Sequence, residues 1–267
     1  MNQNAAAPGT EGLPTLPELL ADAERVLVTH AHPDDETLAT GFLLAHLTAA
    51  GTDAAVLTAT RGEQGEVVPG PLSGLAGTDA FSAHREGELS GALQVLGVRR
   101  HYFLGTGAAR AAGQGSRKYR DSGMRWVKEG LAGPAEESGP DAFTAVAESE
   151  ALADLSAVVA DFDPQVLLSY EADGGYGHPD HVRMHWLTRE AARGAGVRFV
   201  QVVSHADDPR HAIEWTDVPE LLPVVAEALE HHRSQLTVQS AGPAGITVMH
   251  SGGQNDLIRP RYGLLPG

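Results

Sequence analysis

Residues 26–36 have the sequence VLVTHAHPDDE, and this stretch decides the predicted fold. The apolar run at 26–28 is typical of a buried β-strand, and residues 37–50 repeat large apolar side chains at helical spacing. Two imidazoles and three carboxylates therefore follow a strand directly, at the edge of an open α/β sheet where ligands bind. Like charges crowded at a strand end repel one another and do not help folding, so they indicate a bound cation or a reaction. Because Asp34 and Asp35 are adjacent, their side chains should diverge, one toward a metal and the other toward what that metal activates.

The same stretch begins a βαβ unit. Gly51 is placed to end the helix, and residues 53–60 form a second apolar strand after a short link. A strand, a helix and a strand joined by short links imply parallel strands. We therefore predict an α/β fold, a three-layer α/β/α Rossmann-like domain with a mostly parallel sheet.

Further elements are predicted along the rest of the chain. Helices are expected over residues 81–96, 143–162 and 219–236, after residue 181 through Arg193, and in a short piece beginning near residue 16; strands are expected at 100–104, 165–170 and 197–203. Residues 237–267 carry only a weak signal. We expect a single domain over residues 14–267, preceded by a disordered lead-in over residues 1–13.

Residues 105–141 are rich in glycine and charge and have little periodicity. A loop of this length inside a compact domain is usually a functional lid or is disordered. We predict a lid that ligand orders, with residues 118–124 facing the substrate and residues 132–140 acting as linker.

Composition excludes several classes of protein. The formal net charge is -16, from 35 acidic against 19 basic side chains, which argues against a nucleic-acid partner. There is no cysteine, so a zinc ion would have to be held by His, Asp or Glu. The first twelve residues do not resemble a signal peptide, and no apolar run approaches the ~20 residues of a membrane span. We predict a cytoplasmic protein without a membrane partner, and we leave homo-oligomerisation open.

A second His-Pro-Asp run, in the sequence GYGHPDH at 175–181, follows the strand expected at 165–170. A His and an Asp three residues apart suit two metal ligands in a first helical turn, and a His from another strand would complete the set. Three protein ligands plus water is the arrangement of a catalytic zinc, and a nearby carboxylate off the metal can accept a proton. A single His-Pro-Asp run is usually a turn with an Asp cap, but two runs after two strands favour a metal site.

Other polar and aromatic residues have plainer interpretations. Tyr170 and Trp186 are expected to be packing residues, and Glu36 to act as an outer-shell or capping acid. The remaining histidines are expected on the surface or hydrogen-bonded in the core: His30, His46, His84, His101, His185, His205, His211, His231, His232 and His250.

The two motifs, AHPDDE at 31–36 and GYGHPDH at 175–181, resemble those of the LmbE/PIG-L-type zinc-dependent N-acetylglucosaminyl deacetylases. The sequences TRGEQGEV at 60–67, REGEL at 85–89 and RDSGM at 120–124 are similar to those of the deacetylases of mycothiol biosynthesis in particular. The resemblance covers residues 25–195, and mycothiol-conjugate amidases share most of its motifs.

The resemblance implies one zinc per chain, with Fe(II) as an alternative metal. By position, His32, Asp35 and His181 would bind the metal and Asp34 would be the general base. These roles come from the family pattern rather than from spacing alone.

The resemblance also implies roles for residues around the metal. Tyr176 would polarise the acetyl carbonyl, His178 would stabilise the oxyanion or assist proton transfer, and Asp180 would orient His178. Three further positions match those that hold the sugar and its aglycone: Glu66, Arg85 and Asp121.

The expected function is hydrolysis of the N-acetyl group of a small GlcNAc conjugate of the low-molecular-weight thiol precursor type. The alternatives are an amidase acting on thiol S-conjugates and a deacetylase of another GlcNAc compound. From other classes, a metal-dependent phosphoesterase and a zinc-stabilised binding module without activity remain open. Against a phosphoesterase, the sequence has too few clustered ligands outside the two motifs to hold a second metal. Against a binding module, Asp34 is a carboxylate that such a module would not need.

Overall fold

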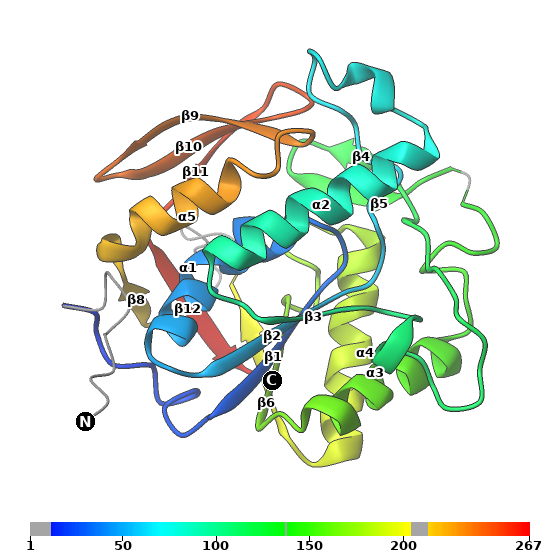
Figure 1. Ribbon diagram of the computed structural model, residues 1–267, viewed down its shortest axis with the longest axis horizontal. Helices are drawn as coiled ribbons and strands as arrows, with labels where there is room; N and C mark the ends of the chain where they lie inside the picture. The colour runs from blue at the N-terminus through cyan, green and yellow to red at the C-terminus, as the bar shows by residue number, and fades with distance from the viewer. Residues whose placement is uncertain (1–11, 137, 204–212) are drawn as a thin grey trace, which may run out of the picture.

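The computed structural model describes residues 12–136, 138–203 and 213–267, so the expected lead-in up to residue 11, His205 and His211 lie outside the described residues. Within these ranges a seven-stranded sheet has the order β3-β2-β1-β6-β7-β12-β8 (Figure 1). Its parallel strands are β1 (Arg25–His30), β2 (Asp53–Thr58), β3 (Arg100–Phe103), β6 (Val166–Ser169) and β7 (Arg198–Val202). Two antiparallel strands, β12 (Arg261–Pro266) and β8 (Trp215–Asp217), extend one edge.

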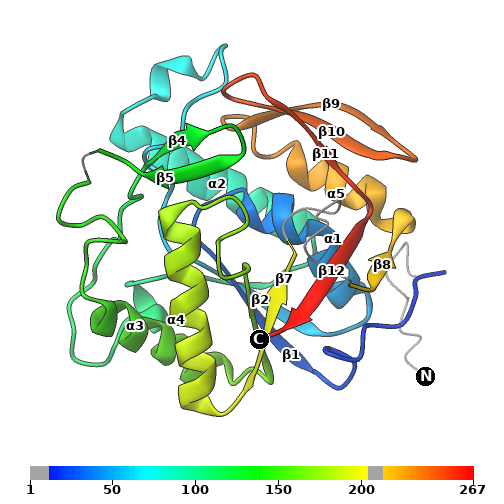
Figure 2. The same cartoon turned by 180° about the vertical axis from the view of Figure 1, so that it is seen from behind.

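Helices cover both faces of this sheet, as two opposite views show (Figures 1 and 2). One face carries α1 (Asp35–Ala49), α2 (Asp79–Val95) and α5 (Leu222–Leu229), and the other carries α3 (Glu148–Phe162) and α4 (Pro179–Ala195). The predicted three-layer, mostly parallel α/β fold is confirmed.

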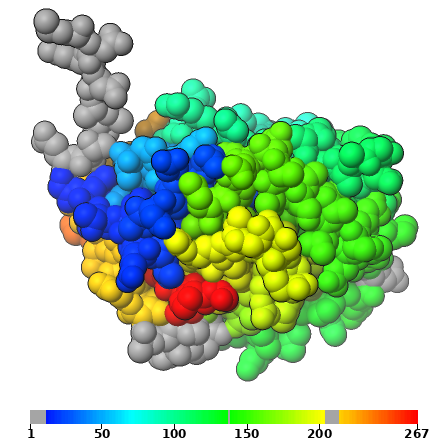
Figure 3. Space-filling model, turned by 90° about the horizontal axis from the view of Figure 1, so that it is seen from below, coloured from blue at the N-terminus to red at the C-terminus, as the bar shows by residue number. Residues whose placement is uncertain are grey.

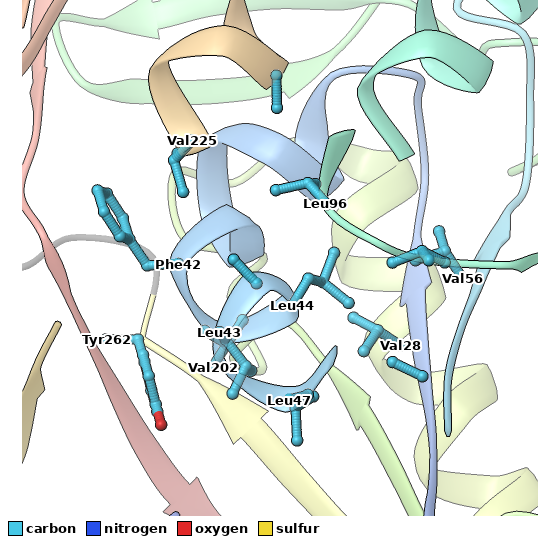
Figure 4. Close-up of a cluster of buried hydrophobic side chains, with 14 of the residues drawn as sticks. Val28, Phe42, Leu43, Leu44, Leu47, Val56, Leu96, Val202, Val225 and Tyr262 are labelled. Atoms are coloured by element: carbon cyan, nitrogen blue, oxygen red, sulfur yellow. The ribbon is translucent and has the colours of Figure 1, made fainter. Parts of the chain in front are cut away.

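The side chains of the buried strands alternate between the two faces of the sheet, and this produces two hydrophobic cores. In β1, Val26 and Val28 pack with α1, α2 and α5, whereas Leu27 packs with α3 and α4, because successive strand residues point to opposite faces. The first of these cores is drawn in Figure 4, where Phe42, Leu43 and Leu47 of α1 lie among strand and helix side chains. β1 is thus buried on both faces and held rigidly, which matters because the first motif follows it directly.

Several predicted elements are shorter than expected or absent. Residues 16–20 do not begin a helix: a turn forms instead, in which the Leu20 N–H donates to the Pro17 carbonyl. The third large helix begins at Glu148, and the residues before it form turns that include the buried Phe143. The helix expected over 219–236 is a 3₁₀ turn (Pro219–Leu221) followed by α5, which ends at Leu229.

Residues 105–141 contain ordered elements despite their low periodicity, and the ordering of this segment as a lid by ligand stays a prediction. A 3₁₀ turn (Gly107–Ala109) is followed by a hairpin of β4 (Met124–Lys128) and β5 (Leu131–Pro134). The fully buried Asp154 of α3 anchors the first half by accepting hydrogen bonds from the Arg110 side chain, the Ala111 N–H and the Tyr119 hydroxyl. Residues 132–134 are hairpin strand rather than linker. These contacts are long-range, so local periodicity could not show them.

The weakly patterned C-terminal part forms strands. β9 (Leu236–Gly242), β10 (Gly245–His250) and β11 (Asn255–Ile258) make a small antiparallel sheet over α5, and β12 returns to the main sheet (Figure 2). The chain ends on the surface beside β7, where the Gly267 N–H donates to the Phe199 carbonyl (Figure 3). Within the described residues, no helix is long and apolar enough to cross a membrane.

Candidate metal centre and active site

The two His-Pro-Asp runs meet at the carboxyl edge of the sheet. β1 pairs with β2 on one side and with β6 on the other, so the loops after β1 and β6 flank the point where the order of strands reverses. In open α/β sheets this switch point is where ligands bind. α1 starts at Asp35 and α4 at Pro179, so each run lies at a helix N-terminus, with Pro179 at the first helical position.

Three side chains form a compact set of donor atoms. His32 Nδ1 lies 3.3 Å from Asp35 Oδ2 and 3.3 Å from His181 Nε2, and His181 Nε2 lies 3.3 Å from Asp35 Oδ1. A tetrahedral metal with bonds of about 2.0–2.1 Å separates its ligand atoms by about 3.3 Å. All three residues are buried. These two nitrogens and one carboxylate could therefore hold a zinc-like cation and leave a fourth position open.

The second nitrogen of His32 faces two other carboxylates. Its Nε2 lies 3.2 Å from Asp180 Oδ2 and 3.6 Å from Asp121 Oδ1. Asp180 is fully buried, and the same oxygen accepts a hydrogen bond from the Ser122 N–H. A carboxylate that accepts from the outer nitrogen of a metal-binding histidine fixes the ring and makes it a better ligand.

The electrostatics of this cluster favour a positive charge. Burial opposes protonation of His32, but Asp121, Asp180 and Asp35 outweigh burial and raise its pKa well above the usual range. Burial would favour the neutral form of Asp35, but His181 and His32 lower its pKa well below the usual range. A divalent cation would supply the positive charge that these groups stabilise.

Tyr170 belongs to the site, although we expected it only to pack in the core. Its hydroxyl donates to Asp35 Oδ2 at 2.7 Å and accepts from the Ala31 N–H at 2.8 Å. Its ring stacks on His181 with centroids 4.2 Å apart. Tyr170 therefore orients one carboxylate and one imidazole of the donor set, and its place just after β6 was the available signal.

Asp34 stands beside the donor set in an unusual conformation. Its φ is 110°, a region that costs a non-glycine residue about 1–3 kcal/mol. Its N–H donates to Glu36 Oε2 at 2.9 Å, and its Oδ2 lies 3.2 Å from Nη2 of the buried Arg85. Burial raises the pKa of Asp34 to about 6, although Arg85 opposes the shift. A carboxylate with this pKa is suited to accept a proton near neutral pH.

His178 and Tyr176 surround the donor set on the side of the second motif. The His178 ring lies 4.6 Å from that of His32, and the Tyr176 ring lies 5.1 Å from that of His181, between centroids. The Asp180 backbone N–H donates to His178 Nδ1, so the neutral imidazole carries its proton on Nε2. Burial, with His32 and His181, lowers the pKa of His178 to about 2, and burial raises the pKa of Tyr176. Both groups are therefore neutral hydrogen-bond donors.

Asp180 contacts His178 with its backbone and not with its carboxylate, and its role in orienting His178 stays a prediction. That carboxylate contacts His32, and only the backbone of Asp180 contacts His178. The carboxylate therefore does not make His178 cationic.

The residues expected to contact substrate differ in their positions. Arg85 donates to the Gly62 and Pro33 carbonyls and pairs with Asp34. Asp121 is buried beside His32 and accepts from the Gln64 and Gly123 N–H groups. Glu66 is exposed, and its carbonyl accepts a hydrogen bond from the Gln235 side chain. The structure thus brings two of these three side chains into the cluster.

The β4–β5 hairpin borders the site. The Ala132 N–H donates to the Tyr176 carbonyl at 2.7 Å, and the rings of Trp126 and Tyr176 lie 5.9 Å apart. Trp126 is 52% exposed, and its hairpin neighbours Val127 and Leu131 are exposed too. An aromatic surface is therefore open to solvent next to Tyr176.

Residues 27–192 match the family model described as PIG-L, GlcNAc-PI de-N-acetylase. The chain belongs to the PIG-L family. A protein of Kineococcus radiotolerans named 1D-myo-inositol 2-acetamido-2-deoxy-alpha-D-glucopyranoside deacetylase is 44% identical over 67% of this chain and 50% of its own length. An identically named protein of Actinosynnema mirum is 34% identical over 88% of this chain and 89% of its own length. The chain spans about half the length of the first curated relatives it matches.

Two solved structures share the fold of this family member. N,N'-diacetylchitobiose deacetylase from Pyrococcus horikoshii has a TM-score of 0.56 at 21% identity, covering 80% of this chain and 71% of its own. A deacetylase–teicoplanin complex from teicoplanin biosynthesis has a TM-score of 0.57 at 19% identity, covering 91% and 98%. At this identity the likeness supports the fold alone.

Replacing Tyr170 by Phe tests the contact between its hydroxyl and Asp35. The variant keeps the stacked ring and loses the hydrogen bond that orients the carboxylate, so we expect divalent-metal affinity to fall about 10–100-fold. Metal titration by calorimetry measures the change. Tyr102→Phe is the matched control, because its hydroxyl bonds to Asp161 on the surface. Equal metal affinity in both variants would contradict a role for Tyr170 at the site.

Proposed function

We propose that this protein is a metal-dependent hydrolase that removes the N-acetyl group from a small GlcNAc conjugate. The observation that carries the proposal is the three-donor set of His32, Asp35 and His181. Asp34 lies next to this set but is not part of it. A donor set with an open position, next to a carboxylate that can accept a proton, is what hydrolysis by water requires. Zinc is the proposed metal, because two imidazole nitrogens and one carboxylate suit it, and Fe(II) is the alternative.

The proposed substrate rests on the relatives. Those named above are inositol GlcNAc deacetylases, and we propose a substrate of that type, an N-acetylglucosamine joined to a small polar aglycone. We also propose that residues 14–267 act as one domain. Cytoplasmic location and homo-oligomerisation stay predictions from sequence.

The side chains divide the reaction among them. A bound divalent metal would lower the pKa of water and polarise the amide carbonyl. Asp34 would accept the proton of the attacking water and later give it to the departing amine, since an amide leaves only when its nitrogen is protonated. Arg85 would hold the Asp34 carboxylate in place.

Two neutral donors would stabilise the negative charge that develops on the carbonyl oxygen. The Tyr176 hydroxyl keeps its proton, and His178 carries a proton on Nε2 because its Nδ1 accepts from the Asp180 N–H. Preorganised donors of this kind are typically worth about 10²–10³ in kcat each. Asp180 would act through His32, fixing the ring whose Nδ1 belongs to the donor set.

The rival functions fit the geometry less well. A two-metal phosphoesterase would need a second site, and the other carboxylate cluster, His32 with Asp121 and Asp180, shares His32 with the first. One imidazole would then have to bridge two cations. A binding module would not need the strained Asp34. An amidase acting on thiol S-conjugates would use the same groups, so only substrates can separate it from a deacetylase.

A substrate panel tests the proposal. We expect the zinc-loaded protein to release free amine from GlcNAc-inositol, with little release from GlcNAc-malate, a thiol S-conjugate or a phosphate ester. Asp34→Asn should keep one metal per chain and lose amine release, because Asn cannot accept the proton. Release from the thiol conjugate alone would make the protein an amidase, and release of phosphate would overturn the proposal.

The pH profile tests the role of His178. As a neutral donor it does not titrate near pH 7, so His178→Ala should lower kcat about 10²–10³-fold across the profile without removing a limb. The acidic limb should persist in this variant, because Asp34, with a pKa of about 6, loses its ability to accept a proton as the pH falls. A basic limb that disappears in His178→Ala would show that the residue acts as a cationic acid.

The hairpin is expected to contact the part of the substrate beyond the acetyl group. Trp126→Ala should raise KM for the conjugate about threefold to tenfold and change kcat little, because stacking on an aromatic ring contributes about 0.5–1.5 kcal/mol. Trp186→Ala, which removes another half-exposed indole from α4, is the control. The same KM in both variants would exclude the hairpin from binding.

A further inference from the structure

A short buried segment follows α5, outside residues 27–192 that match the family model. Residues 232–235 have the sequence HRSQ, and we refer to them as the HRSQ segment. His232, Ser234 and Gln235 are buried, while Arg233 is exposed. Three buried polar side chains in four residues need partners, because an unpaired buried polar group costs about 1–3 kcal/mol.

Each of these side chains bonds to a different element near the candidate site. His232 Nε2 donates to Glu36 Oε1 at 2.8 Å. The Ser234 N–H and hydroxyl donate to the Glu88 carboxylate of α2 at 2.7 and 2.6 Å. The Gln235 amide donates to the Glu66 carbonyl at 3.0 Å. The HRSQ segment therefore connects the first turn of α1, the helix that carries Arg85, and the loop after β2.

The bond to Glu36 is the one that reaches Asp34. The other oxygen of Glu36, Oε2, accepts the Asp34 N–H at 2.9 Å. Glu36 and His232 are both fully buried, and the hydroxyl of the neighbouring Thr37 also donates to Glu36 Oε1. One carboxylate thus joins His232 to the backbone of Asp34, a residue held at a φ of 110°. A strained conformation of this kind persists only where surrounding contacts fix it.

We propose that His232 is a positioning residue for Asp34. It holds the Glu36 carboxylate, which in turn fixes the Asp34 backbone so that the Asp34 side chain meets Arg85. The inference rests on the proposed function for the catalytic role of Asp34, but the positioning itself is a property of the folded chain. The C-terminal part of the protein thereby contributes to a site whose motifs all lie before residue 182.

A purely structural role would give a different result. If the pair of His232 and Glu36 only stabilised the fold, its loss would lower the melting temperature and leave kcat of the folded protein unchanged. Positioning predicts a loss in kcat with KM and metal content retained, since misplacing a catalytic group by about 1 Å can cost about 10²-fold.

The experiment compares His232→Ala and His232→Gln with Ser234→Ala. Gln can still donate to Glu36 from a position near that of Nε2, whereas Ala cannot. Ser234→Ala is the matched control, because it removes a buried side-chain bond of the same segment, to Glu88, and leaves the bonds from His232 through Glu36 to the Asp34 N–H in place. Should His232→Ala not fold, His232→Asn replaces it, since its shorter amide does not reach Glu36.

Hydrogen exchange at the Asp34 amide is the first readout and does not depend on activity. We expect exchange to be at least tenfold faster in His232→Ala and unchanged in Ser234→Ala, and kcat to fall about 10–100-fold in His232→Ala alone. His232→Gln should restore most of the protection of the Asp34 amide from exchange and most of kcat. The inference is overturned if exchange at Asp34 is unchanged in His232→Ala, if Ser234→Ala loses kcat equally, or if His232→Ala loses its metal. Faster exchange as expected, in a protein that deacetylates nothing, would overturn the proposed function and leave the positioning intact.

Discussion

The site depends on one imidazole that uses both of its nitrogens. His32 Nε2 contacts the buried Asp180 carboxylate, and this contact turns Nδ1 toward Asp35 and His181. The residues that contact the ring come from two motifs about 150 residues apart, which can meet only because β1 and β6 are hydrogen-bonded neighbours in the sheet. Because β1 is buried on both faces, the loop that carries the first motif starts from a rigid strand. The geometry of the donor set therefore depends on the packing of the core.

Around this imidazole the protein places more charge than folding alone would favour. Asp34 is strained, half-buried and paired with Arg85, and Glu36 is fully buried against His232. Each carboxylate has a basic partner, because an unpaired buried charge would cost several kcal/mol. Arg85 comes from α2 and His232 from the segment after α5. The C-terminal part of the chain therefore supplies one of the two basic partners. Stability and the placement of the proton acceptor are thereby coupled.

Sequence reasoning found the local elements and both motifs, but it missed single residues that reach the site from elsewhere in the chain. The strand, the helix and the His-Pro-Asp run around His32 are neighbours in sequence, so periodicity and spacing were sufficient to predict them. Tyr170 and His232 bond to Asp35 and Glu36 across 135 and 196 residues, and no local pattern reports such contacts. The same limit explains the ordered structure within residues 105–141, whose first half is anchored on Asp154 in a later helix. The family pattern pointed to the contact between Asp180 and His178, but not to the second contact, which the Asp180 carboxylate makes with His32.

The two sides of the His32 ring offer two places for a cation, and one measurement separates them. Crystals of the zinc-loaded protein, measured on both sides of the zinc absorption edge, locate the metal by anomalous scattering. The account predicts a single peak bounded by His32 Nδ1, Asp35 and His181, with Asp34 outside the coordination sphere. A peak on the Nε2 side, between Asp121 and Asp180, would contradict it.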